Sequence, residues 1–261
     1  MSQVPLAGGA GDNAAGAIGV GAITCDDAML SLGTSGVIFV VTDAFRPNPK
    51  RAVHAFCHCL PGLWHQMAVH LSAAACVDWV GRLIGAASPA AVFEFAERAV
   101  PGPELFLPYL SGERTPHNDP AVRGAFLGLD HDTTPERLAL AVLEGVAFTL
   151  ADGIDAIRDA GTAVERLVVV GGGARAPFWG RILAASLGVR LEYLADSEIG
   201  PAVGAARLAR LAVDGVSIAM CCVRPPVVMT VTPDPEFCKG LSAKRPRFQD
   251  AYCRITPRFH S

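Results

Sequence analysis

The sequence has no extended run of basic residues and no strong excess of either charge. Its 22 Lys and Arg residues nearly balance 25 Asp and Glu residues, which leaves a formal net charge of -3. This balance creates no electrostatic field that would collect nucleic acid or an anionic membrane surface. We therefore expect a small polar partner, with no nucleic acid and no membrane.

Long apolar segments free of polar groups are also missing. The longest stretch without a formally charged residue covers residues 52–77, and it holds four histidines and the Pro61-Gly62 turn. A bilayer would leave these polar groups without hydrogen-bond partners. The opening residues MSQVPLAGG have no basic segment followed by an apolar stretch and a cleavage site, so the sequence predicts a cytoplasmic protein.

The eight cysteines lack the spacing of a disulfide framework and are expected to be mostly reduced thiols. Cys57 and Cys59 lie near three histidines, at positions 54, 58 and 65, which could suggest zinc. On a strand, however, residues 57 and 59 face one way while 54 and 58 face the other, and no second CxxC or HxxxH motif completes four ligands. Zinc is therefore the weaker alternative, and no metal ligand is predicted.

Apolar periodicity and turn residues predict an α/β protein, and the 51% apolar composition of 261 residues supplies core for one large domain or two modest ones. The expected strands cover residues 4–6, two runs of a hairpin within 28–42, and 53–59, 64–69, 124–129, 166–170 and 191–194. The expected helices cover residues 13–20, 72–84, 89–98, 134–160, 176–187 and 201–211. The proline-rich stretch 101–120 is expected to be an ordered loop.

The stretch GGAGDNAAGAIGVG, residues 8–21, surrounds a single acid, Asp12, with glycine and alanine. Its first glycines fit the GxGxxG/A dinucleotide fingerprint, with Asp26 or Asp27 at the distance of a ribose-binding acid. In that fold the acid closes the second strand, whereas here both aspartates precede the next apolar run. Spacing alone therefore favours Asp12 as a helix N-cap, and a Walker A motif is absent.

Two further glycine motifs follow strands: LSLGTSG at residues 30–36 and VVVGGGARAPFWGRILA at residues 168–184. Taken alone, the first can be an ordinary hairpin turn, and the second can serve only the close packing of a helix on a sheet. A strand, a glycine loop and a helix are also the outline of a phosphate-binding or nucleotide-binding site.

The order of the motifs resembles the C-terminal half of the FGGY carbohydrate kinases of the actin-like ATPase superfamily, in particular those that act on D-xylulose. The similar stretches are GGAGDNAAGAIGVG, LSLGTSG, HAFCHCLPGLWHQM, SAAACVDWVGRLIG, FLPYLSGERTPHNDP, RGAFLGLDHDTTPERLALAVLEGVAF and VVVGGGARAPFWGRILA. The similarity runs from about Val4 to Leu211, with a looser echo at residues 223–236. It implies an α/β, actin-like (ribonuclease H-like) fold, with a mixed sheet flanked by helices.

The resemblance implies that Asp12 is the general base that takes a proton from the sugar hydroxyl as this attacks the γ-phosphate of ATP. A base of this kind contributes about 10²- to 10⁴-fold in rate. Capping and catalysis can coexist, because the cap would fix one carboxylate oxygen while the other faces the substrate. Asn13, beside the base, is expected to bond a sugar hydroxyl.

The resemblance also implies ATP, with Mg²⁺, as the phosphoryl donor. The glycine and hydroxyl of the GTSG turn would meet phosphate oxygens, the GGGAR turn would make room for adenosine, and the following helix would point its N-terminus at the nucleotide. The implied nucleotide-binding residues are Gly33, Thr34, Gly81, Gly172, Gly173, Ala174 and Pro177. Glu113 and Arg114 match another family stretch, and a loop-pinning salt bridge and a substrate role both stay open for them.

Members of this family are roughly twice as long as this chain, with two domains and a cleft between them. The resemblance therefore divides the chain into residues 1–11, the end of an N-terminal domain with the catalytic loop, residues 12–215, the C-terminal kinase domain, and a divergent tail, residues 216–261. In the tail, Gly240 and Pro246 predict broken helix and poor order. The residues that mainly hold Mg²⁺ and grip the sugar are expected in the absent half.

We therefore expect a truncated or separately encoded kinase half with weak or no turnover by itself. D-xylulose is the expected substrate and D-xylulose 5-phosphate the product. The alternatives are another sugar or polyol of this family, or a non-catalytic nucleotide-binding or sugar-binding half. A second copy of the chain and an N-terminal partner domain are both kept open as protein partners.

Overall fold

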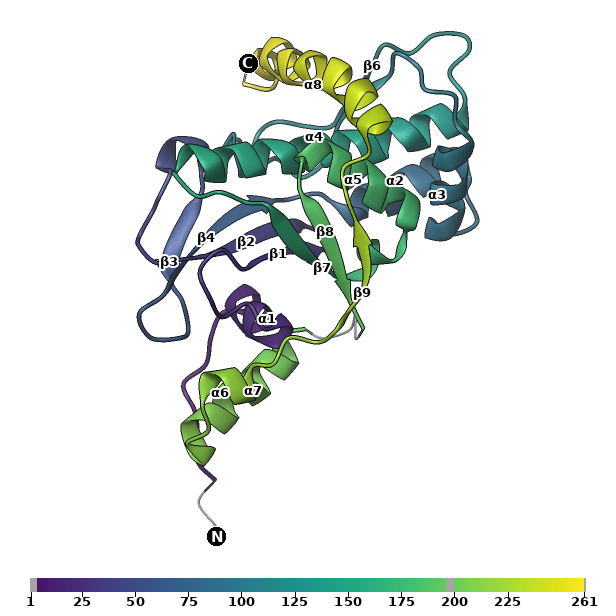
Figure 1. Cartoon of the computed structure of the whole chain (residues 1–261). Coiled ribbons are helices and arrows are strands. Elements are labelled where there is room, and N and C mark those ends of the chain that lie inside the picture. The colour runs from purple at the N-terminus through teal and green to yellow at the C-terminus, as the bar shows by residue number, and fades with distance from the viewer. Residues whose placement is uncertain (1–3, 196–199, 261) are drawn as a thin grey trace.

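The computed structural model describes residues 4–195 and 200–260 (Figure 1). Within them, one seven-stranded mixed sheet has the order β3-β4-β2-β1-β7-β8-β9. Its strands are β1 (Ala28–Leu32), β2 (Gly36–Thr42), β3 (His54–Cys57), β4 (Trp64–His70), β7 (Arg166–Val170), β8 (Arg190–Leu194) and β9 (Val227–Val231). β5 (Leu105–Leu107) and β6 (Ala125–Leu127) form a separate small sheet.

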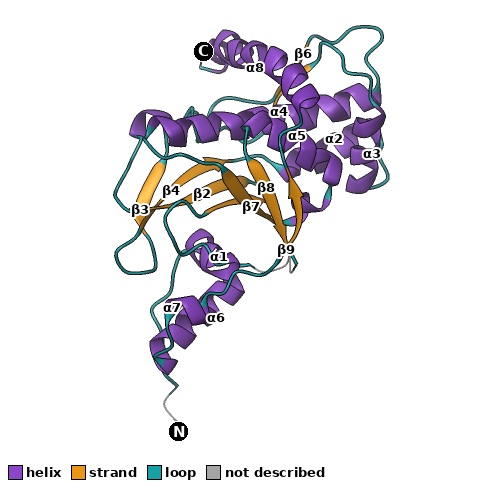
Figure 2. Cartoon of the chain, in the orientation of Figure 1, coloured by secondary structure: helices purple, strands orange, loops and turns teal. Residues whose placement is uncertain are grey.

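The described helices lie on both faces of the large sheet (Figure 2). One face carries α2 (Ala74–Ile84), α3 (Pro89–Arg98), α4 (Pro135–Asp159), α5 (Pro177–Leu187) and α8 (Pro235–Ile255). The other face carries α1 (Asp12–Val20), with α6 (Pro201–Asp214) and α7 (Ile218–Cys221) packed beyond it. The predicted mixed sheet flanked by helices is therefore present, and β1 pairs antiparallel with β2 but parallel with β7.

The long helix α4 forms the centre of the larger core. Thr134 caps it by accepting a hydrogen bond from the Arg137 amide, and Pro135 occupies the first turn, as the sequence predicts. Residues 139–154 of this helix are all buried. Gly145 and Gly153 permit this depth, because a Cβ on the first would collide with the Phe106 carbonyl and on the second with the His70 ring.

Three sequence predictions are wrong at the level of secondary structure. Residues 4–11 form no strand, and Val4 and Leu6 are 77% and 95% exposed, so these side chains bury nothing that would hold a strand in place. The stretch 101–120 is not wholly a loop, since it contains β5. Finally, α8 is one continuous helix through Gly240 and Pro246, where the sequence predicts a broken helix.

Tertiary contacts explain why α8 forms despite these residues. Leu241 and Phe248 bury one face of it in the main core. On the same side, the Arg245 guanidinium donates hydrogen bonds to Asp152 and Asp155 of α4, and Gln249 donates one to Asp152. Burial and ion pairing along the helix thus outweigh the one backbone hydrogen bond that a proline removes.

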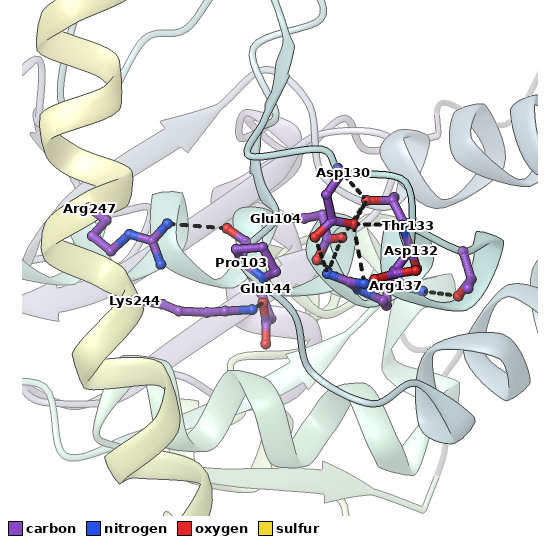
Figure 3. A network of polar contacts seen from close by, with 10 residues as sticks. Pro103, Glu104, Asp130, Asp132, Thr133, Arg137, Glu144, Lys244 and Arg247 are labelled. Atoms are coloured by element: carbon purple, nitrogen blue, oxygen red, sulfur yellow. Dashed lines mark hydrogen bonds and ion pairs between the residues drawn. The ribbon is translucent and has the colours of Figure 1, made fainter.

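Polar contacts also hold the loop before β5 to its neighbours (Figure 3). On α4, Arg137 pairs with the buried Glu104 carboxylate at 2.7 Å, and the Thr133 hydroxyl donates to the same group at 2.7 Å. On α8, Arg247 donates to the Pro103 carbonyl at 3.3 Å, and Lys244 ties α8 to α4 by pairing with Glu144 at 2.7 Å. Both helices therefore fix this loop.

No helix in the described ranges has the length and apolar character needed to cross a bilayer.

Replacing Arg245 by Ala should lower the free energy of unfolding, because Asp152 is only 3% exposed and would keep Gln249 as its side-chain partner without a counter-charge. Removal of one partner from a buried pair costs about 3–5 kcal/mol, and the partial exposure of Arg245 reduces the expected loss to about 2 kcal/mol. Urea unfolding followed by circular dichroism measures it. The matched control is Arg254→Ala, which breaks an exposed pair with Asp250 and should cost under about 0.5 kcal/mol; equal losses would contradict this account.

Candidate active site

Two glycine turns meet at one edge of the sheet. β1 and β7 pair in parallel, with Met29 opposite Val168 and Ser31 opposite Val170, so both strands end at the same edge. The turn that follows each strand therefore lies beside the other. A Cβ on Gly171 would lie 2.7 Å from the Leu32 carbonyl oxygen, which shows how closely the second turn approaches the end of β1.

The GTSG turn after β1 is tied to the start of α2. The Gly33 carbonyl accepts a hydrogen bond from the Ala74 amide, and the Thr34 carbonyl accepts one from the Ala73 amide, each at 2.9 Å. The Thr34 side chain is exposed, and a Cβ on Gly33 would have only one atom, the Ser35 carbonyl oxygen, within 4 Å. The turn thus offers an open backbone and a hydroxyl at the sheet edge, as a phosphate-binding turn requires.

The GGGAR turn after β7 divides into residues that pack and residues that stay open. Gly171 has φ 96°, a left-handed conformation that favours glycine. Gly173 is buried, and a Cβ on it would lie 2.8 Å from both Leu32 and Trp179, whereas Gly172 is exposed with nothing within 4 Å. Gly172 can therefore approach a ligand, while Gly173 serves packing.

The helix after this turn begins at the exposed Pro177, as the sequence predicts. Its N-cap residue, Ala176, has no side-chain acceptor, and within the described residues no side chain caps α5, so its first amides suit an anion. Ala174 belongs to the turn by its backbone, and its side chain lies outside the described part of the structure.

Gly81 stands apart from the two turns. It is buried in the second half of α2, and a Cβ on it would lie 3.0 Å from Val92 of α3. Close packing of the two helices accounts for this glycine, so the nucleotide role predicted for it gains no support from the geometry and stays a prediction.

Asp12 begins α1, but it does not cap the helix. Gly11 occupies the N-cap position and no side chain forms a capping hydrogen bond, so the predicted cap is wrong. A residue already inside the first turn cannot fold its side chain back onto the next amides as an N-cap does. The exposed Asp12 carboxylate instead accepts a hydrogen bond from the Asn13 side-chain Nδ2 at 3.3 Å, which leaves acceptor capacity for a substrate.

A cavity of about 340 Å³ opens beside Asp12. Residues 9–14 form one wall, and the hairpin of β3 and β4 forms the other through Phe56, Cys57, Cys59, His65 and Met67. The two walls touch where the Cys59 Sγ lies 3.8 Å from the Ala14 carbonyl oxygen. This volume suits a small molecule. Apart from zinc as the weaker alternative, no binding role is predicted for the hairpin wall, although HAFCHCLPGLWHQM is one of the stretches similar to the family.

Two buried histidines support the hairpin wall. Burial lowers the pKa of His58 to about 4, and burial together with the neighbouring His58 lowers that of His65 to about 4, so both rings are neutral at pH 7. The His65 ring stacks on Phe39 with centroids 4.4 Å apart. In the described part of the chain, His65 Nδ1 and His58 Nε2 have no hydrogen-bond partner, and no group of three or more His, Cys, Asp or Glu side chains could hold a metal.

Of three acids singled out in the sequence, Asp27 and Glu113 are buried and bonded within the fold, and Asp26 is exposed. Asp27 is buried and pairs with Arg166 and Arg224; burial acts to raise its pKa, but hydrogen bonds from Thr24 and the charge of Arg224 lower it. Asp27 therefore forms ion pairs within the fold. Asp26, by contrast, is exposed. Glu113 is 2% exposed and accepts hydrogen bonds from the Leu71 and Arg114 amides, so it pins its loop to the sheet.

Comparison with known proteins decides the family. Residues 28–213 match the C-terminal domain of the FGGY family of carbohydrate kinases.

The chain belongs to the FGGY family of carbohydrate kinases.

Among curated relatives, the xylulose kinase of Escherichia coli K12 is 45% identical over 260 residues, which cover 98% of this chain and 54% of the relative. A crystal structure titled xyloylose kinase from Brucella ovis has a TM-score of 0.91 at 42% identity, covering 96% of this chain and 53% of that one. The xylulose kinase from Rhodospirillum rubrum has a TM-score of 0.86 at 28% identity, covering 97% and 52%. The predicted family and actin-like fold are confirmed, and the chain spans about half the length of these FGGY kinases.

The two neighbouring glycines of the GGGAR turn, Gly172 and Gly173, make a matched pair. Gly173→Ala should lower the free energy of unfolding by about 1–3 kcal/mol, because its Cβ would press on Leu32 and Trp179 in a packed interior. Gly172→Ala adds a methyl group in open space and should change it by under about 0.5 kcal/mol. Urea midpoints of the two variants test this, and a larger loss in Gly172→Ala would contradict the assignment.

The neutral histidines predict sensitivity to acid. An unfolded histidine takes up its proton near pH 6.5, whereas folded His58 and His65 do so near 4, so stability is full above 6.5 and falls as the pH drops toward 4. Protonation of each ring should lower the free energy of unfolding by about 1.4 kcal/mol per pH unit across that window. Urea unfolding at pH 7.5, 6 and 5 measures the slope, and His58→Gln should flatten it. Equal stability at all three values in the unaltered chain would refute the neutral pair.

Proposed function

We propose that this chain is the C-terminal half of an ATP-dependent kinase that converts D-xylulose to D-xylulose 5-phosphate. The observation that carries the proposal is the exposed Asp12 carboxylate, which lies free of any capping bond in the wall of a small-molecule cavity. The names of the relatives, xylulose kinases that include one at 45% identity, support the sugar.

Asp12 has the chemistry of a general base in this setting. One carboxylate oxygen accepts a hydrogen bond from the Asn13 side-chain amide, which restricts the orientation of the carboxylate. The remaining lone pairs can accept the proton of a sugar hydroxyl. The hydroxyl oxygen then forms a bond to the γ-phosphorus as the bond to the β,γ-bridging oxygen of ATP breaks. The Asn13 side chain lines the same cavity, and we propose that it bonds a second hydroxyl.

The nucleotide would lie along the edge where the two glycine turns meet. The Gly33-Thr34 turn offers an open backbone and a hydroxyl for phosphate oxygens, and Gly172 offers open space for the nucleoside. The uncapped N-terminus of α5, after Ala174 and Pro177, adds a favourable dipole for anionic groups. Gly173 supports this site from behind by packing on Leu32 and Trp179.

Magnesium fits this site only in part. Mg²⁺ in phosphoryl-transfer sites is bound through one or two carboxylates together with substrate phosphates. Among the described residues that line the cavity, Asp12 supplies the one carboxylate. When bound with ATP, the ion neutralises phosphate charge, and we propose that its main protein ligands lie in the N-terminal half that longer FGGY kinases have.

Because the chain matches only about half of its relatives' length, we expect it to have little activity by itself. The chain covers 54% of the Escherichia coli relative, and phosphoryl transfer depends on positioning from both sides of a cleft. We therefore propose that the partner is an N-terminal kinase domain. The alternative partner is a second copy of the chain, and the proposed location is the cytoplasm. A coupled assay should find little D-xylulose-dependent ADP formation by the 261-residue chain; ordinary kinase rates would contradict this.

The base assignment is tested in the chain joined to the N-terminal domain of its Escherichia coli relative. Asp12→Asn should lower kcat by about 10²- to 10⁴-fold while ATP affinity stays unchanged, because the amide cannot accept the proton as a carboxylate does. The control is Asp26→Asn, an exposed acid outside the cavity, which should keep full turnover.

Turnover and calorimetric ATP binding measure these effects. Unchanged turnover in Asp12→Asn would contradict the assignment. Binding of ATP or sugar without any turnover in the joined protein would favour a non-catalytic binding half instead. A substrate panel would show whether another ketopentose or a polyol is preferred.

A further inference from the structure

Glu113 is a deeply buried acid that the proposed mechanism does not use. Its side chain is 1% exposed, and among the described residues no Lys or Arg side chain lies within ion-pair distance of its carboxylate. The Nδ1 atom of His70 lies 3.6 Å from one carboxylate oxygen and has no hydrogen-bond partner in the described part of the chain. Because desolvation makes an acid at this depth costly, the hydrogen bonds that Glu113 accepts must offset the cost.

Three hydrogen bonds orient this carboxylate. Its Oε1 accepts one from the Leu71 amide at 2.9 Å and one from the Arg114 amide at 2.7 Å. Its Oε2 accepts one from the buried Thr149 hydroxyl of α4 at 3.3 Å. Leu71 directly follows the last residue of β4. The carboxylate thus ties the end of β4 to the central helix of the core.

The residues that follow Leu71 hold the GTSG turn. The Ala73 and Ala74 amides donate hydrogen bonds to carbonyls of the turn, each at 2.9 Å. Packing adds to these bonds, because a Cβ on Gly36, the last residue of the turn, would lie 3.2 Å from the Ala73 Cβ. Residues 71–74 therefore link Glu113 at one end to the GTSG turn at the other.

This link is short and buried. Only Ser72 lies between the residue that Glu113 holds and the first residue that holds the turn, and Ser72 and Ala73 are 2% and 0% exposed. A packed interior passes a displacement on to its neighbours instead of absorbing it. A shift of the Leu71 amide should therefore move Ala73, and with it the turn.

We propose that Glu113 is a positioning residue for the GTSG turn. Through the Leu71 amide its carboxylate fixes residues 71–74, and these hold the turn in the open shape in which its backbone and hydroxyl meet the phosphates of ATP. Burial keeps Glu113 itself out of contact with nucleotide and sugar. The inference rests on the proposed function, in which this turn binds phosphate.

The positioning role is tested in the chain joined to the N-terminal domain of its Escherichia coli relative. Glu113→Ala should raise the KM for ATP about tenfold, because the turn loses its alignment, and should leave the KM for D-xylulose within about twofold. A loss of stability alone reduces the amount of folded enzyme, which lowers the measured kcat and changes neither KM. The split between the two KM values therefore separates positioning from a purely structural role.

Two further variants show what the side chain at position 113 must supply. Glu113→Gln keeps an oxygen that accepts hydrogen bonds from amides, so the KM for ATP should stay within about threefold of that of the unaltered protein. Glu113→Asp keeps the charge but is one methylene group too short to reach the Leu71 amide, so it should raise the KM for ATP as Ala does. The Asp variant carries the test in the event that Glu113→Ala does not fold.

Glu104→Ala is the matched control. Glu104 is also 1% exposed and lies in the same proline-rich stretch, but its carboxylate is bound by Thr133 and Arg137 and not by residues that hold the turn. Its loss should lower the free energy of unfolding and leave the KM for ATP unchanged. An equal rise in this KM in both Ala variants, or no rise in Glu113→Ala, would overturn the inference.

Thr34→Ala separates the inference from the proposed function. This variant removes the hydroxyl of the turn and should raise the KM for ATP about threefold. If it does so and Glu113→Ala does not, the turn binds phosphate and the positioning role of Glu113 is refuted. If neither variant changes the KM for ATP, the phosphate-binding role proposed for the turn is refuted together with it.

Discussion

The parallel pairing of β1 with β7 is the constraint on which the site depends. It makes two strands that lie more than a hundred residues apart in the chain end at one edge, where the turns that hold Gly33 and Gly172 follow them. Gly171 and Gly173 are the residues that allow this approach, since a side chain at either would push the second turn away from Leu32. The neighbouring strands of the sheet and α4 keep β1 and β7 buried.

The place of Asp12 depends on the opposite face of the sheet. Ala17 and Val20 of α1 pack on Met29, Phe39 and Val168, so the helix is fixed by its buried half and its first turn is left exposed. A second contact locks it from outside, because Gly204 of α6 lies so close to the Ala15 carbonyl that a side chain there would collide with it. Helix packing thus accounts for the small Ala15, whereas Gly9 and Gly11 pack on nothing and lie in the wall of the cavity.

Much of the fold could be read from the sequence because its elements carry strong local signals. The apolar run of β7, the Thr134-Pro135 start of α4 and the Pro177 start of α5 are local signals that agree with the elements the fold forms. α8 could not be read in this way, because its helix depends on Arg245 reaching carboxylates of α4 nearly a hundred residues away. The cap assigned to Asp12 failed for a smaller reason, a shift of one residue at the helix start.

The site itself was only partly within reach of sequence reasoning. The glycine turns and Asp12 belong to recognisable motifs, but the hairpin wall with Cys57 and His65 becomes visible only when β3 and β4 are folded against the Asp12 loop. The most direct measurement is a crystal structure of the chain assembled with an N-terminal kinase domain, D-xylulose and a non-hydrolysable ATP analogue. The account predicts an Asp12 carboxylate oxygen about 2.6–3.2 Å from the hydroxyl that faces the γ-phosphate. A sugar bound away from this cavity, or an Asp12 side chain turned from the reacting hydroxyl, would contradict it.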